Sequence, residues 1–168
     1  MPEYDLKFSK KLIEAAELVA KNDLVEIESK RTVLYLSLLS CEITMKALLE
    51  KAGLSIKEIK SHGHNFSELL KEIGDCEIYK DLTTSCPRWV RATGLRSITI
   101  DTSFSNATVG TLLTAERNGA SIFPNQIRYG DKITHYPPEV MLEVAKAIVA
   151  WGETYWDKIR IVLPSVTN

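Results

Sequence analysis

The sequence has little cysteine and almost no net charge, and each shortage excludes a class of protein. Its three cysteines, Cys41, Cys76 and Cys86, include no Cys-x-x-Cys pair, which is typical of a reducing compartment rather than a disulfide framework. We expect all three to be structural. The formal net charge of −1 excludes a strong general attraction for nucleic acid, so any such contact needs a local basic patch.

Long apolar runs are also missing. The apolar run at residues 33–39 is shorter than the ~20 residues that a membrane span needs. The first eleven residues contain acidic side chains and no apolar segment, so we expect no secretory signal. These features predict a cytoplasmic protein that does not bind a membrane.

The 168 residues, 45% hydrophobic and 26% charged, indicate one globular domain spanning residues 1–168. Apolar side chains recur at three- and four-residue steps, which predicts helices. Asp5 caps a first helix that ends near Asn22. A second helix runs from about Ser29 to Ala52 and stops at Gly53. Because this helix is apolar on two faces, we expect it at the centre of a bundle.

Two short helices follow, and each begins with the spacing of a capping box. Ser55 precedes Glu58 by three residues, and Asn65 precedes Glu68 in the same way, so both pairs can satisfy the first N–H groups of a helix. The second of these helices is predicted to end at Gly74.

The segment 75–124 is less regular, and we interpret it as an insertion between the third and last helices. It contains a short ordered piece near 78–82, a β-prone polar run at 97–104 and a helix over 108–118. The expected fold is all-α, an up-and-down helical bundle of four to five main helices with this irregular insertion.

The last helix is predicted to open at Pro137 and Pro138, because proline is best tolerated in the first turn of a helix. Val144, Ile148 and Trp151 then recur on one face. Pro164 is predicted to close this helix.

The clearest basic and aromatic cluster contains Arg88, Arg91 and Arg96 within nine residues that include no acid, with Trp89 among them. Such a cluster suits contact with phosphates together with stacking on bases. Lys80 extends it. The alternative is a solvated face from which Trp89 turns inward.

Histidine and carboxylate spacings give two further candidates. Glu42 and Lys46 stand four residues apart, as in an ion pair along one helix. His62 and His64 could present two imidazoles to one metal. No cluster of cysteines or carboxylates completes four ligands, so we expect no metal, and we assign His64 to packing or hydrogen bonding at its turn.

Three segments have an order and spacing that match one family. The first is Glu42-Ile43-Thr44-Met45-Lys46, with an acid four positions before a lysine in an apolar helix. The second is Gly63-His64-Asn65-Phe66, a turn into the next helix, and the third is Arg128-Tyr129-Gly130 ahead of the last helix. Together they resemble the HEPN superfamily, small α-helical domains of toxins, defence systems and nucleotidyltransferase partners.

The resemblance implies a catalytic pair. Many HEPN ribonucleases carry an arginine followed by four to six residues and a histidine, and Arg128 and His135 satisfy this spacing. Arg128 would hold the scissile phosphate and His135 would act as acid or base, without metal or cofactor. Tyr129 stands where the family has a small polar residue, and we place it with the RNA- or nucleotide-binding residues. The alternative pairs Arg128 with a carboxylate and leaves His135 near a helix start.

Two functions follow from the resemblance. One is a metal-independent endoribonuclease of a toxin or defence system, acting on RNA as a homodimer and countered by an antitoxin. The other is a non-catalytic HEPN module that binds RNA, a nucleotide, or a partner such as a nucleotidyltransferase. A purely structural helical scaffold is the third interpretation.

Overall fold

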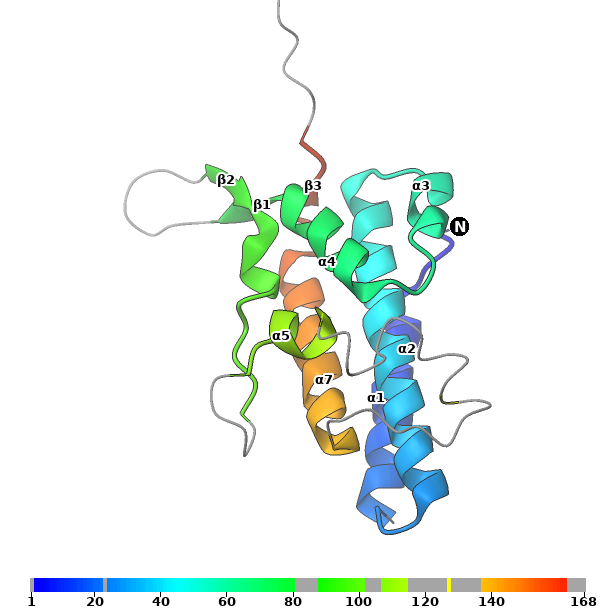
Figure 1. The fold of residues 1–168 in the computed structure, drawn as a ribbon. Helices are drawn as coiled ribbons and strands as arrows, with labels where there is room; N and C mark the ends of the chain where they lie inside the picture. Colours follow the sequence, from blue (N-terminus) through cyan, green and yellow to red (C-terminus); the bar gives the residue numbers. More distant parts are fainter. Residues whose placement is uncertain are drawn as a thin grey trace, which may run out of the picture.

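The structure is a computed structural model that describes residues 2–22, 24–80, 88–101, 107–114, 127 and 137–162. In chain order its elements are α1 (Leu6–Asn22), α2 (Ile27–Ala52), α3 (Ile56–Ser61), α4 (Phe66–Asp75), β1 (Glu77–Lys80), β2 (Arg88–Arg91), the 3-10 helix η1 (Ala92–Leu95), α5 (Val109–Thr114), α7 (Pro138–Tyr155) and β3 (Ile159–Arg160) (Figure 1).

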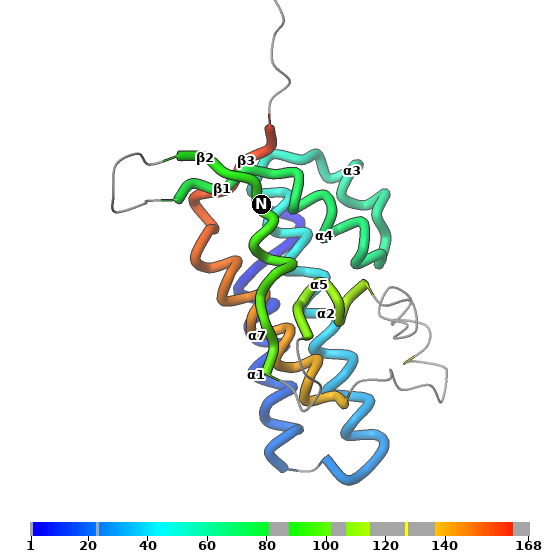
Figure 2. Tube along the Cα trace, turned by 60° about the vertical axis from the view of Figure 1, so that its left-hand side comes forward, coloured from blue at the N-terminus to red at the C-terminus, as the bar shows by residue number. Residues whose placement is uncertain are grey.

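The long helices α1, α2 and α7 form a bundle in which α2 is central. Figures 1 and 2 show α1 antiparallel to α2, while α7 runs in the same direction as α2. α2 packs against both of its long neighbours and also against α4. Its fully buried side chains include Leu34, Leu38, Met45 and Leu48. The predicted all-α helical bundle, with the second helix at its centre, is confirmed.

Small residues bring the three long helices close together. The hydroxyl groups of Ser9 on α1 and Thr44 on α2 lie 2.8 Å apart, and the Ser40 hydroxyl donates to the Ser9 carbonyl at 2.9 Å. On α7, a Cβ added to Gly152 would lie only 3.1 Å from Thr44 Cγ2. The interface around these residues is therefore both polar and tight, because no larger side chain holds the helices apart.

The ends of the first two helices follow the predicted chemistry. Asp5 Oδ1 accepts the N–H of Lys7 at 2.8 Å, which caps α1. Gly53 has φ 111° and donates its N–H to the last turn of α2. This left-handed conformation suits glycine and ends the helix. α2 begins at Ile27 rather than at the predicted Ser29.

The N-caps of α3 and α4 are confirmed, and α3 has the full capping box. Ser55 Oγ accepts the N–H of Glu58 at 3.3 Å, and the Glu58 carboxylate accepts the N–H of Ser55 at 3.0 Å. Asn65 Oδ1 accepts the N–H of Glu68 at 3.2 Å. α4 continues one residue beyond the predicted stop at Gly74.

The predicted irregular insertion contains a β-hairpin. β1 pairs antiparallel with β2 and with β3, in the order β2-β1-β3. The predicted β-prone run at 97–104 is not a strand in its described part, where Thr99 forms an isolated bridge to Thr108. Strands of two to four residues carry little local signal, and their pairing in the folded chain decides where they form. α5 occupies the start of the predicted 108–118 helix.

The last helix begins as predicted and ends earlier. Pro137 is the N-cap and Pro138 is the first residue of α7, which ends at Tyr155. Pro164, the predicted stop, lies outside the described residues, and β3 has already formed before it. The prediction missed this strand because two residues carry no periodic pattern.

α2 is long and apolar enough, by length and composition alone, to cross a membrane. Its most apolar window has a mean hydropathy of 1.4, yet 72% of that window is buried inside the protein. Burial among neighbouring helices accounts for the apolar composition, as in the core helix of a soluble protein.

Candidate functional site

Three of the predicted binding residues, Arg88, Trp89 and Arg91, lie on β2. In the antiparallel pair with β1, Trp89 stands opposite Tyr79 and Arg91 stands opposite Glu77. Directly opposite residues point to the same face of a sheet, and successive residues alternate. Trp89 and Arg91 therefore share one face of the hairpin, whereas Arg88 points to the other.

β3 adds an arginine to the face that carries Trp89. Arg160 stands opposite Glu77 on β1, and its guanidinium lies over the Trp89 ring, with Cζ 3.9 Å from the ring centroid. Arg160 Nη2 and Nε donate to the same Glu77 oxygen at 2.9 and 3.1 Å. The rings of Tyr79 and Trp89 meet edge to face, 5.6 Å apart. We call Glu77, Tyr79, Trp89, Arg91 and Arg160 the hairpin face.

Both arginines of the hairpin face are held by acidic residues at the surface. Arg91 Nη1 donates to the Asp75 carbonyl at 2.5 Å and lies 3.7 Å from its carboxylate. The Arg91 and Arg160 side chains are 56% and 50% exposed. The Arg91–Asp75 pair is exposed on both sides, and such pairs contribute only about 0 to 1 kcal/mol, so another anion can replace Asp75 at little cost. Glu77 is only 25% exposed and is the better-held partner.

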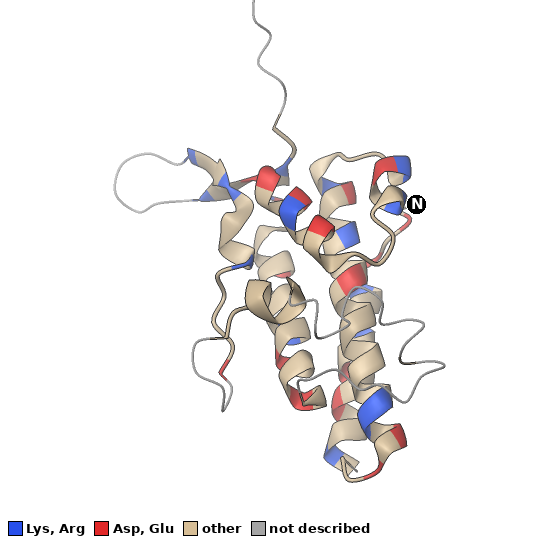
Figure 3. Cartoon of the chain, in the orientation of Figure 1, with Lys and Arg blue, Asp and Glu red and all other residues tan. Residues whose placement is uncertain are grey.

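Lys80 and Arg88 are cross-strand neighbours. They place two cations on the other face of the hairpin. Neither forms an ion pair with another described residue. Figure 3 marks the Lys and Arg positions of β1 and β2 in blue along the ribbon. Lys80 is therefore a neighbour of Arg88, one member of the predicted basic cluster, on the face away from Trp89 and Arg91. Trp89 is half-buried, and Arg160 rather than the helical core covers its ring.

Arg96 does not join the hairpin face. Its carbonyl accepts the N–H of Gly110 at 2.9 Å, and its Nε lies 3.5 Å from where a Cβ on Gly110 would stand. Arg96 therefore packs against the first turn of α5. The sequence grouped it with Arg88 and Arg91 because the three are close along the chain, but η1 turns the backbone away after β2.

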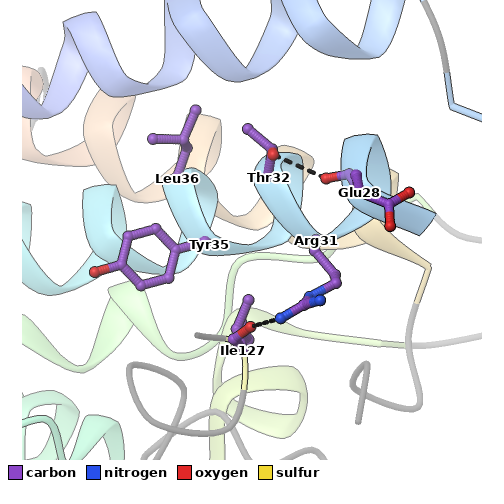
Figure 4. A pocket seen from close by; sticks show the side chains of 6 residues that line it. All are labelled: Glu28, Arg31, Thr32, Tyr35, Leu36 and Ile127. Atoms are coloured by element: carbon purple, nitrogen blue, oxygen red, sulfur yellow. Dashed lines mark hydrogen bonds between the residues drawn. The ribbon is translucent and has the colours of Figure 1, made fainter. Parts of the chain in front are cut away.

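The predicted catalytic residues Arg128 and His135, together with Tyr129, lie outside the described residues. Ile127, which precedes Arg128 directly in the sequence, is buried, and its carbonyl accepts a hydrogen bond from Arg31 Nη2 at 2.5 Å. Figure 4 shows this contact at a hollow of about 320 Å³ on the N-terminal half of α2. The hollow is lined by Glu28, Arg31, Thr32, Tyr35, Leu36 and Ile127.

The residues of two predicted features meet in one network. Lys46 Nζ lies 2.7 Å from Glu42 Oε1, and His64 Nδ1 lies 2.8 Å from Glu42 Oε2. The predicted Glu42–Lys46 pair is confirmed, but both side chains are only 7% exposed, so the small energy of a surface pair does not apply. His64 is 54% exposed. The Lys46 ammonium also lies 5.5 Å from the Tyr4 ring centroid.

This Glu42 network ties the turn before α4 to the middle of α2. Glu42 accepts from both partners, so each of its oxygens has a donor and the buried negative charge is compensated. The prediction that His64 serves hydrogen bonding at its turn is confirmed, with a side-chain acceptor on another helix. Among the described residues, no three His, Cys, Asp or Glu side chains gather as a metal site would require.

Two of the cysteines, Cys41 and Cys76, are buried and free. Burial raises the pKa of the Cys41 thiol far above its usual value. Burial, aided by the Glu72 and Asp75 carboxylates, raises the pKa of Cys76 to about 12. Nucleophilic chemistry needs the thiolate, so these two cysteines are structural, as predicted. Cys86 lies outside the described residues.

Tyr79, Asp75 and Arg160 were missed by sequence reasoning. Arg160 is separated from its partner Glu77 by 83 residues, and no local pattern relates the two. The adjacent β-branched and aromatic residues Ile78 and Tyr79, within Glu77–Lys80, are a weak local signal for a strand.

The fold and these contacts define an all-α helical-bundle protein that carries a small three-stranded sheet. No family model, curated protein or solved structure matches the chain.

Proposed function

We propose that this helical bundle is an RNA- or nucleotide-binding protein whose ligand contacts the hairpin face. The observation that carries the proposal is the stack of the Arg160 guanidinium on the Trp89 ring, at 3.9 Å, beside Tyr79 and Arg91. A planar cation backed by an indole offers a base a stacking surface, and aromatic residues next to cations are the usual means of holding single strands.

The charges of the hairpin face allow a phosphate to replace a carboxylate. In the described part of the chain, Arg91 pairs with the exposed Asp75, and Arg160 pairs with Glu77, which is 25% exposed. A phosphate can take the place of the Asp75 carboxylate, because that exposed pair is weak and a guanidinium binds phosphate bidentately. Lys80 and Arg88 add two positive charges at the other end of the hairpin, three positions along the strands from Glu77 and Arg91.

The resemblance to the HEPN superfamily supports the same function. Glu42, from the first matching segment, contacts Lys46 of the same segment and His64 of the second, across α2 and the turn before α4. The family includes ribonucleases and partners of nucleotidyltransferases, and ligands of both kinds contain nucleotides.

Titration of a fluorescently labelled single-stranded RNA, followed by anisotropy over a range of salt concentrations, tests the proposal. Trp89→Ala should weaken binding by about 1 to 3 kcal/mol, the contribution of one base–aromatic stack. Arg91→Ala should flatten the salt dependence by about one phosphate contact. Lys11→Ala is the matched control, because Lys11 is exposed on α1 and, among the described residues, forms an ion pair with Glu14 alone.

The control variant should bind as the wild type does. Absence of wild-type binding at about 50 mM salt, where phosphate contacts are strong, would contradict the proposal. Binding that is insensitive to Trp89→Ala and Arg91→Ala would place the ligand elsewhere on the molecule.

Cleavage of RNA is a second candidate, with Arg128 as phosphate clamp and His135 as acid or base. The supporting observation is the contact of Arg31 with the Ile127 carbonyl, which anchors the residue before Arg128 at the hollow on α2. Structured RNA should be cleaved in the presence of a chelator, and Arg128→Ala or His135→Ala should abolish cleavage. Activity that survives both substitutions contradicts this site.

The same experiment separates the two interpretations of the family resemblance. A wild-type protein that binds RNA without cleaving it is a binding module, and a nucleotidyltransferase is then the partner class to test first. A catalytic homodimer should sediment as two chains, because two Arg128–His135 pairs are expected to meet at a two-fold axis.

A further inference from the structure

The three-stranded sheet has an open edge at β2. The strand order is β2-β1-β3, so β2 pairs on one side only, and no other described strand lies along its outer side (Figure 1). An open edge presents unpaired backbone N–H and C=O groups to any extended chain that fits them. The outer edge of β2 is therefore a place where a further strand can add.

The backbone groups available at this edge follow from the pairing inside the sheet. Tyr79, opposite Trp89, donates its N–H to the Lys158 carbonyl at 2.8 Å, on the β3 side of β1. Tyr79 and Trp89 are therefore a non-hydrogen-bonded pair. In an antiparallel ladder every second pair is of this kind, so Arg91 belongs to the same set. The N–H groups of Trp89 and Arg91 consequently point away from β1.

The charges on β2 determine which kind of strand can pair with its outer edge. Arg88 and Arg91 stand at the two ends of β2 and both are exposed. Pairing with a second copy would bring four arginines, two from each copy, into one short ladder, and like charges across a ladder destabilise it. Positive side chains on edge strands serve in this way to prevent self-association. An acidic strand instead gains attraction at both ends.

We propose that the outer edge of β2 binds an extended segment of a partner protein that carries two acidic residues three positions apart. Added antiparallel, the segment places one acid opposite Arg91 and the other opposite Arg88. The residues opposite Arg91 and Trp89 form the hydrogen-bonded pairs. Strand addition of this kind takes its affinity from the backbone and its specificity from side chains. The inference is independent of the proposed RNA binding.

A labelled eight-residue peptide with the core Glu-Val-Thr-Glu tests the edge directly, titrated to about 1 mM because so small an interface is weak. Its Lys-Val-Thr-Lys counterpart should not bind. N-methylation of the threonine, which lies opposite Trp89, should abolish binding. N-methylation of the valine, whose N–H points away from β2, should leave affinity within twofold. Equal effects of the two methyl groups, or equal affinity of the two peptides, would overturn the proposal.

A pair of protein variants gives a second test. Arg91 has φ −55° and ψ 138°, which proline adopts without strain. Arg91→Pro removes the charge and the outward N–H, whereas Arg91→Ala removes the charge alone. Arg91→Pro should bind the acidic peptide roughly threefold to tenfold more weakly than Arg91→Ala, the loss of one hydrogen bond. Circular dichroism checks that both variants fold. Equal affinities in folded variants contradict strand addition, and the methylated peptides decide the question on wild-type protein if Arg91→Pro does not fold.

Discussion

His64 Nδ1 lies 2.8 Å from Glu42 Oε2, and this contact joins residues that are 22 positions apart. The same carboxylate pairs with Lys46, one turn further along α2. One buried acceptor therefore connects the turn before α4 with the central helix. Removing Glu42 leaves the buried Lys46 ammonium without its carboxylate partner, which is costly even where the intact pair contributes little.

Glu42→Ala should reduce the free energy of unfolding by about 3 to 5 kcal/mol, because the buried Lys46 ammonium then has no counter-charge. Urea denaturation followed by circular dichroism measures the change. Glu14→Ala is the matched control, since Glu14 pairs with Lys11 at the surface and should cost no more than about 1 kcal/mol.

An apolar replacement of both charges completes this test. The double variant Glu42→Met with Lys46→Met should be more stable than Glu42→Ala, because no unpaired charge remains in the core. A double variant as unstable as the single one would show that the Glu42 network does more than compensate buried charge.

Gly152→Ala should destabilise the bundle although alanine favours a helix by about 1 kcal/mol. The added Cβ would lie 3.1 Å from Thr44 Cγ2, and the contact between the Thr44 and Ser9 hydroxyls limits how far that side chain can turn. Thermal or urea unfolding measures the effect.

Thr44→Ser deletes the obstructing methyl group and keeps the hydroxyl. In that background Gly152→Ala should become stabilising, which gives a favourable coupling between the two positions. If the two effects simply add, contact with the Thr44 methyl group is not the reason why position 152 disfavours a residue larger than glycine.

Cys76 and Cys41 should resist alkylation by iodoacetamide at pH 8 in the folded protein and react in urea. Burial raises the pKa of both thiols, that of Cys76 to about 12, so little thiolate forms. Mass spectrometry of the digested protein resolves the two sites. Rapid labelling of either residue in the folded chain would contradict its buried position.

The same pKa shift predicts how stability depends on pH. The unfolded Cys76 thiol ionises near its ordinary value of 9.0, whereas the folded thiol stays protonated. The contribution of this thiol to the free energy of unfolding is therefore complete below pH 9 and decreases as the pH rises from 9 toward 12. Cys76→Ala should lose stability less steeply than the wild type over this range in urea titrations.

The helices could be read from the sequence because their signals are local. Asp5, Ser55 and Asn65 cap helices within three residues of themselves, and Gly53 ends α2 through its own backbone conformation. The repeat of apolar residues along α2 also indicated that it would be buried on more than one face. None of these features needs a distant partner.

The hairpin face could not be read in this way. Glu77 meets Arg160 and Trp89 meets Arg160 only because β3 returns to β1 after α7. Arg96 shows the opposite error, since it is close to Arg91 in the chain but packs against α5. Proximity along the sequence was a poor guide wherever a strand or a 3-10 turn redirected the backbone.

The sequence by itself determined the helical bundle, the centrality of α2 and the caps, because hydrogen bonds within a helix and apolar periodicity act over a few residues. Tertiary structure alone decided which charges are buried and which aromatic ring meets which arginine. Folding places His64 and Lys46 against the Glu42 carboxylate. It also places the Arg160 guanidinium over the Trp89 ring. Burial and electrostatic pairing depend on neighbours in space, and the folded chain supplies them.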